Sequence, residues 1–198
     1  MPYRRTPKIQ ARLDAQRAAI LDAAGELLAE HGYAGCSVAA VAAKAGVATG
    51  SVYKHFPGKA ELVVELFRAV VGHEVEAVTA AAELPGDPDE RVVAAFETFA
   101  LRALKAPRRA YALLAEPVDA PVEAERIVFR RVFRDVAAKH IREGVAKGLL
   151  PQQDSGRTAA ALVGAVTEVL VGPLTTDNTD VLADLRTFIL RALGGSHV

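Results

Sequence analysis

The sequence is poor in the residues that mark many classes of protein. Its 198 residues include one cysteine, one methionine and no tryptophan, and aromatic residues make up only 6%. A single cysteine, Cys36, excludes a disulfide within the chain, so we expect a reducing, cytoplasmic compartment. The basic N-terminus lacks the apolar core of a secretory signal. The most apolar stretch, residues 159–174, is interrupted by Thr167 and Glu168, so no membrane span is expected.

Motifs for catalysis and for metal binding are absent as well. The sequence has no GxGxxG, GxSxG, HExxH or paired-cysteine pattern, and the Gly-Lys pair at 58–59 lacks the rest of a P-loop. Sparse pairs such as His140 and Glu143 are more typical of a solvated helix surface than of a metal site. Cys36 is interpreted as a small buried side chain, with a reactive thiol as the alternative. We therefore expect no enzyme, no metal and no cofactor.

The charge is zero overall but is unevenly distributed. Residues 1–60 hold eight Lys and Arg against four Asp and Glu, whereas the rest of the chain holds 16 against 20. A basic first third on an acidic remainder indicates a polyanion-binding module joined to another unit. The first 13 residues form a basic arm that either enters a DNA minor groove or is a solvated tail. Its cations are Arg4, Arg5, Lys8 and Arg12.

Apolar residues at helical spacing predict an all-α fold, since no segment shows the alternation of a strand. A first helix is expected over 14–30, a second after the N-cap Ser37, and a third over 49–55. Longer helices should follow, separated by prolines and glycines. Their expected ranges are 59–84, 88–105, 108–116, 121–148, 154–175 and 178–193.

The second and third helices have the spacing of a helix-turn-helix, because a short turn containing Gly46 joins them. In that motif the later helix enters the major groove of DNA. Thr49, Gly50 and Ser51 would open this helix, where free backbone amides attract phosphate or face base edges. A glycine inside a short helix costs roughly 1 kcal/mol, so Gly50 suggests that a partner approaches closely there.

The same helix continues with side chains that suit phosphate oxygens. Tyr53, Lys54 and His55 supply a phenol, a cation and an imidazole, and Lys54 also has the reach for a guanine edge. Lys59 would oppose the dipole of the following helix unless a phosphate lies nearby. Ser37 caps its own helix and leaves amides aimed at a phosphate.

These residues lie in "GYAGCSVAAVAAKAGVATGSVYKHFPGKAEL", which resembles the DNA-binding signature of the TetR family of bacterial transcriptional regulators. The resemblance implies a helix-turn-helix domain over 14–58 and a helical ligand-binding and dimerisation domain over 59–198. It implies phosphate contacts from Ser37, Tyr53, His55 and Lys59, and base or backbone contacts from Thr49, Gly50, Ser51 and Lys54. One residue departs from the signature: Ala48 stands where the family usually has Ser or Thr.

The resemblance further implies that the last two helices pair with their copies in a homodimer, although they would also suit a simple core. The expected interface residues are Ala160, Val163, Gly164, Thr167, Leu182, Leu185, Phe188 and Ile189. An effector pocket would be lined by aromatics at helical spacing with convergent polar groups, although such aromatics on a long helix are more often core residues. The pocket candidates are Phe96, Phe99, Tyr111, Phe129, Arg130, Phe133, His140 and Thr167.

The sequence thus predicts a ligand-responsive regulator, in which a dimer binds a palindromic double-stranded DNA operator and a small molecule releases it. Two alternatives stay open: an activator of the same fold, and an α-helical small-molecule-binding protein that never contacts DNA. The recognition helix has no Arg, Asn or Gln whose bidentate pairing would name a base, so neither operator nor effector follows from the sequence.

Overall fold

The computed structural model describes residues 6–175 and 181–194, and every regular element in these ranges is an α-helix. The first, α1 (Pro7–Gly35), begins earlier than the predicted residue 14. The hydroxyl of Thr6 accepts a hydrogen bond from an amide in the first turn, and proline suits the first helical position. Lys8 and Arg12 therefore lie on an exposed helix and not in an extended arm. Residues 4 and 5 of that arm lie outside the described residues.

The predicted helix-turn-helix is confirmed by α2 (Val38–Lys44) and α3 (Thr49–His55). The hydroxyl of Ser37 accepts a hydrogen bond from an amide of the first turn of α2 at 3.2 Å. Gly46 joins the two helices with φ 66°, a left-handed conformation that favours glycine. Gly32 has φ 67° inside α1, and it bends the last residues of α1 toward α2. We call α1–α3 the head.

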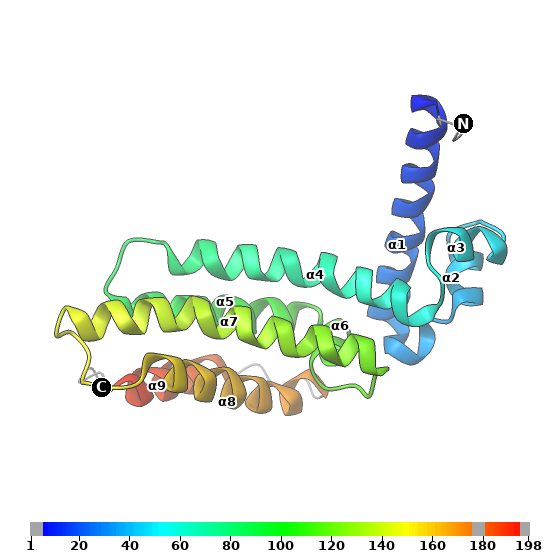
Figure 1. The fold of residues 1–198 in the computed structure, drawn as a ribbon. Coiled ribbons are helices and arrows are strands. Elements are labelled where there is room, and N and C mark those ends of the chain that lie inside the picture. Colours follow the sequence, from blue (N-terminus) through cyan, green and yellow to red (C-terminus); the bar gives the residue numbers. More distant parts are fainter. Residues whose placement is uncertain (1–5, 176–180, 195–198) are drawn as a thin grey trace.

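The remaining helices match the predicted ranges to within a few residues, and we call them the body. They are α4 (Lys59–Ala82), α5 (Pro88–Lys105), α6 (Pro107–Leu114), α7 (Ala120–Ala146), α8 (Ser155–Thr175) and α9 (Val181–Leu193). In Figure 1 α4, α5 and α7 run along the length of the body, and α8 and α9 form its other side. The head lies at one end, where the first turns of α1 project away from the body.

The body is built around an aromatic cluster. Phe133 packs edge-on against Phe99 and Phe129, with ring centroids 4.8 and 5.1 Å apart, and Phe96 and Phe67 complete the cluster. All five rings are buried. Such edge-to-face pairs add about 0.5–1.5 kcal/mol each to the hydrophobic gain of burial. The predicted pocket aromatics of α5 and α7 are therefore also core residues, as the simpler interpretation held.

Candidate nucleic-acid interface and effector cavity

The two faces of α3 differ completely. Val52 and Phe56 are 0% and 1% exposed and anchor the helix to the apolar core of the head. The opposite face is exposed, and it carries Thr49, Gly50, Tyr53 and Lys54. Within the described residues, the side chains of Thr49, Tyr53 and Lys54 have no hydrogen bond or ion pair. The head therefore presents a rigid face whose donors are free for an external partner.

Gly50 gives this face a second property. A Cβ atom built on Gly50 would meet no described atom within 4 Å, so neighbouring side chains do not explain the glycine. Its φ is also ordinary, because Gly50 is not among the glycines with positive φ. Ala48, at the N-cap of α3, provides no side-chain cap. The start of α3 is therefore bare backbone on an exposed surface.

Two other predicted contact residues are less free. The imidazole of His55 is half-buried, and its Nε2 lies 3.0 Å from Oε1 of Gln16 on α1. Ser51 is also half-buried, whereas Ser37 is exposed and has its hydroxyl engaged in the cap of α2. In this conformation His55 therefore helps to fix α3 against α1.

Lys59 has a partner that the sequence did not suggest. Its Nζ lies over the ring of Tyr33, 3.8 Å from the centroid, in cation–π geometry. The electron-rich face of the ring offsets the unfavourable position of a cation in the first turn of α4. The conflict between Lys59 and the helix dipole is thus relieved within the protein. Tyr33 stood in the quoted signature, but a contact across 26 positions in sequence leaves no local pattern.

Tyr33 is itself held by the connection between α6 and α7. Its hydroxyl donates a hydrogen bond to the carboxylate of Asp119, and its backbone amide donates to Oε2 of Glu116 at 2.8 Å. The amide of Ala34 donates to the other oxygen of Glu116 at 3.3 Å. Burial raises the pKa of Tyr33 to about 12, and the hydrogen bond to Asp119 adds to the shift. We call Tyr33, Lys59, Glu116 and Asp119 the junction.

A buried arginine fixes the position of that connection. Arg126 of α7 is 6% exposed, and its guanidinium donates to the backbone carbonyls of Leu113 at 2.8 Å and Glu116 at 2.9 Å. It also pairs with Glu123 at 2.6 Å. Burial lowers the pKa of Arg126, while the charge of Glu123 opposes that shift. Arg126 thus supplies donors for carbonyls that the end of α6 leaves unpaired.

Cys36 is fully buried between the head helices, as predicted for a small core side chain. Its thiol lies 3.6 Å from the carbonyl of Ala24 and 3.5 Å from that of Gly32. Desolvation raises the pKa of this thiol to about 11, against the attraction of the nearby Lys59 cation. The described residues contain no cluster of three metal-ligating side chains.

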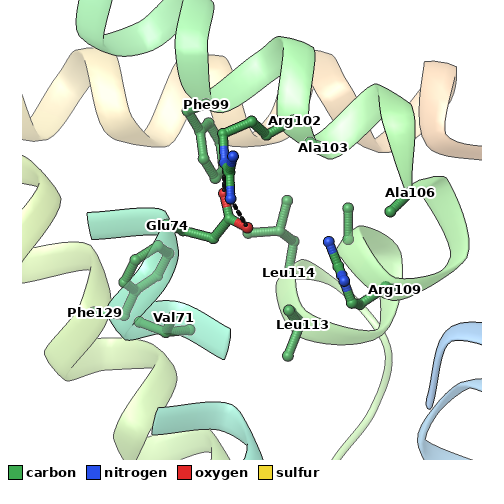
Figure 2. Close-up of a pocket in the computed structure, with 11 residues that line it drawn as sticks. Val71, Glu74, Phe99, Arg102, Ala103, Ala106, Arg109, Leu113, Leu114 and Phe129 are labelled. Atoms are coloured by element: carbon green, nitrogen blue, oxygen red, sulfur yellow. Dashed lines mark hydrogen bonds and ion pairs between the residues drawn. The ribbon is translucent and has the colours of Figure 1, made fainter. Parts of the chain in front are cut away.

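The body contains a small cavity beside α6 (Figure 2). Its volume is about 30 Å³, enough for one water molecule. Leu113 and Leu114 of α6 form one wall, and Phe99 and Phe129 from α5 and α7 form another. Figure 2 shows Arg102 and Glu74 facing each other at the cavity, where Nε of Arg102 lies 2.5 Å from the carboxylate. Apart from this ion pair and Arg109, the side chains that line the cavity are apolar.

A second cavity of about 10 Å³ lies within the aromatic cluster, next to the first cavity. It shares Phe99, Phe129 and Leu114 with the first cavity. An open groove of about 460 Å³ lies outside it, between α7 and α8, and shares three lining residues with it: Arg130, Val163 and Thr167. The three spaces therefore lie next to one another, from the groove past the aromatic cluster to α6.

The groove between α7 and α8 is strongly basic. Arg130, Arg131 and Arg134 line it, against one acid, Glu168. Arg134 pairs with its neighbour Asp135, whereas Arg130 and Arg131 are exposed and have no ion pair among the described residues. Unpaired guanidinium groups in a groove suit a carboxylate or a phosphate.

The predicted pocket residues thus divide into two groups. Phe96, Phe99, Phe129, Arg130, Phe133 and Thr167 come together in or beside the second cavity. Tyr111 instead lines an open pocket against the head, with Glu30 and Arg108. His140 lines none of these pockets: it is 1% exposed, and neither ring nitrogen has a hydrogen bond.

The predicted dimer residues also divide. Val163, Leu185 and Ile189 are buried within their own chain, and Leu182 is half-buried. The exposed members are Ala160, Gly164 and Phe188, of which Phe188 is 44% exposed.

Contrary to the sequence expectation, residues 155–174 of α8 are long and apolar enough to cross a membrane by length and composition, with mean hydropathy 1.3. Only 28% of that stretch is buried within the chain.

Comparison with known proteins points to one family. Residues 20–66 match the sequence profile of bacterial regulatory proteins of the tetR family. The fatty acid metabolism regulator protein of Bacillus subtilis is 40% identical over 57 residues, which span 29% of each chain. The HTH-type transcriptional repressor KstR2 of Mycobacterium tuberculosis is 26% identical over 144 residues, covering 69% of this chain and 72% of the repressor. The first match is therefore confined to less than a third of its relative.

The fold of the whole chain is similar to that of solved regulators. The transcriptional regulator FadR from Bacillus subtilis, solved in complex with stearoyl-CoA, matches with a TM-score of 0.77 at 21% identity and covers 91% of this chain and 99% of FadR. The profile match falls on the helix-turn-helix of the head, and the structural match extends over the body. The chain therefore resembles the TetR family of DNA-binding transcriptional regulators in the sequence of its helix-turn-helix and in its overall fold.

Proposed function

We propose that the protein is a cytoplasmic, homodimeric repressor that binds a palindromic operator and is released by a small amphiphilic molecule. The observation that carries DNA binding is the exposed face of α3, with unpaired Thr49, Tyr53 and Lys54 above the buried anchors Val52 and Phe56. Such a face fits the major groove, with Tyr53 and Lys54 on phosphates or base edges. The similarity to a named transcriptional repressor supports repression rather than activation.

Dimerisation is supported by the exposed face of α8. Ala160 and Gly164 lie one turn apart on that face, and a Cβ on Gly164 would meet nothing within 4 Å in its own chain. Small residues at this spacing let two helices approach closely. The apolar, mostly unburied α8 is therefore suited to pair with the same helix of a second copy, together with Phe188 of α9. A twofold axis would then match the symmetry of a palindrome.

The proposed effector carries an anionic head and a long apolar tail. Arg130 and Arg131 at the groove would bind the phosphates, and the tail would pass through the aromatic cluster toward Leu113 and Leu114. The stearoyl-CoA complex of a regulator with the same fold supports this class of ligand.

Size suggests how such a ligand would act. Ligand pockets usually measure about 300–1,000 Å³, far more than the internal cavities of about 30 and 10 Å³. An acyl chain can enter only if α6 or α7 moves outward, because these helices form the cavity walls. The ligand would therefore bind an opened body more tightly than the closed one. In the opened conformation the distance between the two heads would no longer fit the operator.

The first experiment selects a duplex from random DNA with the purified protein and measures its binding at increasing salt. We expect a palindromic sequence and a steep decrease of affinity with salt. Failure to enrich any sequence would favour a helical binding protein that does not contact DNA. A reporter gene behind the selected operator then separates repressor from activator by the direction of its response.

The second experiment adds stearoyl-CoA, free coenzyme A or stearate to that complex. We expect release by stearoyl-CoA, about 5- to 150-fold in affinity, and much weaker effects of the two parts. A double variant, Arg130→Ala with Arg131→Ala, should need more stearoyl-CoA for the same release but bind DNA normally in its absence. Arg142→Ala removes an exposed arginine of α7 that does not line the groove, and it is the matched control.

A further inference from the structure

The four junction residues join three parts of the molecule that the proposed function uses separately. Tyr33 belongs to the end of α1, Lys59 opens α4 beside the helix-turn-helix, and Glu116 and Asp119 follow α6. Tyr33 contacts all three of the others, through its ring, its backbone amide and its hydroxyl. It is 7% exposed, so these contacts are protected from water.

The contact with Lys59 places that cation. An isolated lysine side chain has about 2 kcal/mol of rotamer entropy, so a free ammonium is spread over many positions. The ring of Tyr33 restricts Nζ to a site 3.8 Å from its centroid and partly desolvates it. Lys59 is half-buried there, at the base of the helix-turn-helix. A cation fixed in this way has already lost the entropy that binding a phosphate would otherwise remove.

The contacts with Glu116 and Asp119 tie the same ring to the effector cavity. Arg126 binds the carbonyls of Leu113 and Glu116, and it lines the cavity within the aromatic cluster. Leu113 lines the cavity beside α6. Outward movement of α6 therefore displaces Glu116, and Glu116 holds the backbone of Tyr33. Arg108 at the start of α6 gives a second attachment, since it donates to the carbonyl of Glu30 on α1 at 2.7 Å.

We infer that Tyr33 is a positioning residue for DNA binding: its ring holds Lys59 for a backbone phosphate, and Glu116 and Asp119 make that hold depend on α6. This inference rests on the proposed function and specifies how the effector site regulates the head. A ligand that opens the body pulls the α6–α7 connection away from α1. Tyr33 then shifts beneath Lys59, and the phosphate contact weakens before the heads have separated.

A double-mutant cycle on the selected operator tests the first half of the inference. Tyr33→Leu should weaken binding about fivefold to tenfold and lower the slope of log affinity against log salt by about one, as Lys59→Ala does. In the double variant the second change should add almost nothing, because Tyr33 acts through Lys59. Lys44→Ala removes a head cation that is paired with Glu26 and Glu30, and it should leave the slope unchanged.

Tyr33→Phe tests the second half, because it keeps the ring and removes the hydrogen bond to Asp119. We expect nearly normal affinity without effector, but release by stearoyl-CoA reduced to less than half of the wild-type factor. Circular dichroism checks that Tyr33→Leu is folded; if it is not, Tyr33→Phe still tests the coupling. Additive effects in the cycle, or a normal stearoyl-CoA response of Tyr33→Phe, would overturn the inference while wild-type operator binding leaves the proposed function intact. Wild-type protein that selects no operator overturns both.

Discussion

The exposed face of α3 and the interior of the body differ in how their polar side chains are paired. On α3 the polar groups Thr49, Tyr53 and Lys54 are exposed and unpaired above an apolar anchor. Inside the body the guanidinium of Arg126 is buried and hydrogen-bonded, and Arg102 is paired with Glu74 beside the cavity. The ring of His140 is the exception among these described groups, because it is buried without a hydrogen bond. An exposed, unpaired set is available to an external partner. A buried, paired set fixes helices against one another and registers any change in their packing.

The largest expected effect separates the two faces of α3. Phe56→Ala should cost about 3–5 kcal/mol of unfolding free energy, because it empties a fully buried site at the base of the recognition helix. Tyr53→Ala, three positions earlier and 53% exposed, should change stability by less than about 0.5 kcal/mol while weakening the binding of all DNA sequences. Urea denaturation at one protein concentration measures the first effect, and operator titration the second. Equal losses of unfolding free energy in the two variants would contradict the assignment of Phe56 to the buried face of α3 and of Tyr53 to its exposed face.

The difference between buried and exposed helix faces also explains which helix bounds were predicted well from the sequence. Helices of the body have broad apolar faces, so their spacing gave bounds within a few residues, as for α5 at Pro88–Lys105. The start of α1 was missed because residues 7–13 are nearly all exposed and have no apolar period. Its remaining signal is local, the cap Thr6 followed by proline. Apolar spacing recognises buried faces, and it does not recognise helices that project into solvent.

The candidate sites also differ in how well they could be predicted from the sequence. The exposed residues of α3 follow from a local motif, because a helix-turn-helix fixes its own outer face. The junction was not predicted, since Tyr33, Lys59 and Asp119 meet only through tertiary packing. His140 was predicted to face a ligand from its residue type alone, yet the structure places it away from the described cavities. Sequence patterns therefore predicted the exposed residues of α3 better than the interior of the body.

Arg126→Met tests whether buried polar groups in the body are structural. Methionine has a similar length but no donors, so the carbonyls of Leu113 and Glu116 lose their partner at the end of α6. We expect a loss of about 2–4 kcal/mol in unfolding free energy, because buried carbonyls and Glu123 are left unpaired. Arg131→Met, an exposed change on the same helix, is the control and should be nearly neutral. A neutral Arg126→Met would show that α6 is not held by this residue.

Alkaline pH tests the junction through Tyr33, and it also tests the buried thiol of Cys36 in the head. Their pKa values in the fold, about 12 and about 11, lie above the ordinary values of 10.0 and 9.0. A raised pKa stabilises the fold below the unfolded value and loses that contribution as pH rises through the folded value. Stability should therefore decrease between about pH 9 and pH 12, by at most about 3 kcal/mol per group. Tyr33→Phe should be less stable than wild type at pH 8 but lose less stability above pH 10, whereas exposed Tyr53→Phe should follow wild type.

The smallest expected effect comes from His140. It tests whether every buried polar group in the body contributes to the stability of the fold. The nearest carboxylate oxygens, on Glu83 and Glu143, are each 3.8 Å from a ring nitrogen, beyond hydrogen-bond distance. Leucine has a similar volume and leaves no buried nitrogen unsatisfied, so His140→Leu should change stability by less than about 1 kcal/mol at pH 7.5. Exposed His73→Leu is the matched control.

Acid should then separate His140→Leu from wild type. Burial lowers the pKa of His140, so its neutral ring favours the fold above the unfolded pKa of about 6.5, and that contribution is lost as pH falls below it. Between pH 6.5 and pH 5, before most carboxylates titrate, wild-type stability should fall while that of His140→Leu stays nearly constant. Urea unfolding across this range measures both. A loss of more than about 2 kcal/mol in unfolding free energy for His140→Leu at pH 7.5 would mean that the ring has a hydrogen-bond partner in solution. The buried polar groups of the body would then be paired, as those of the junction are.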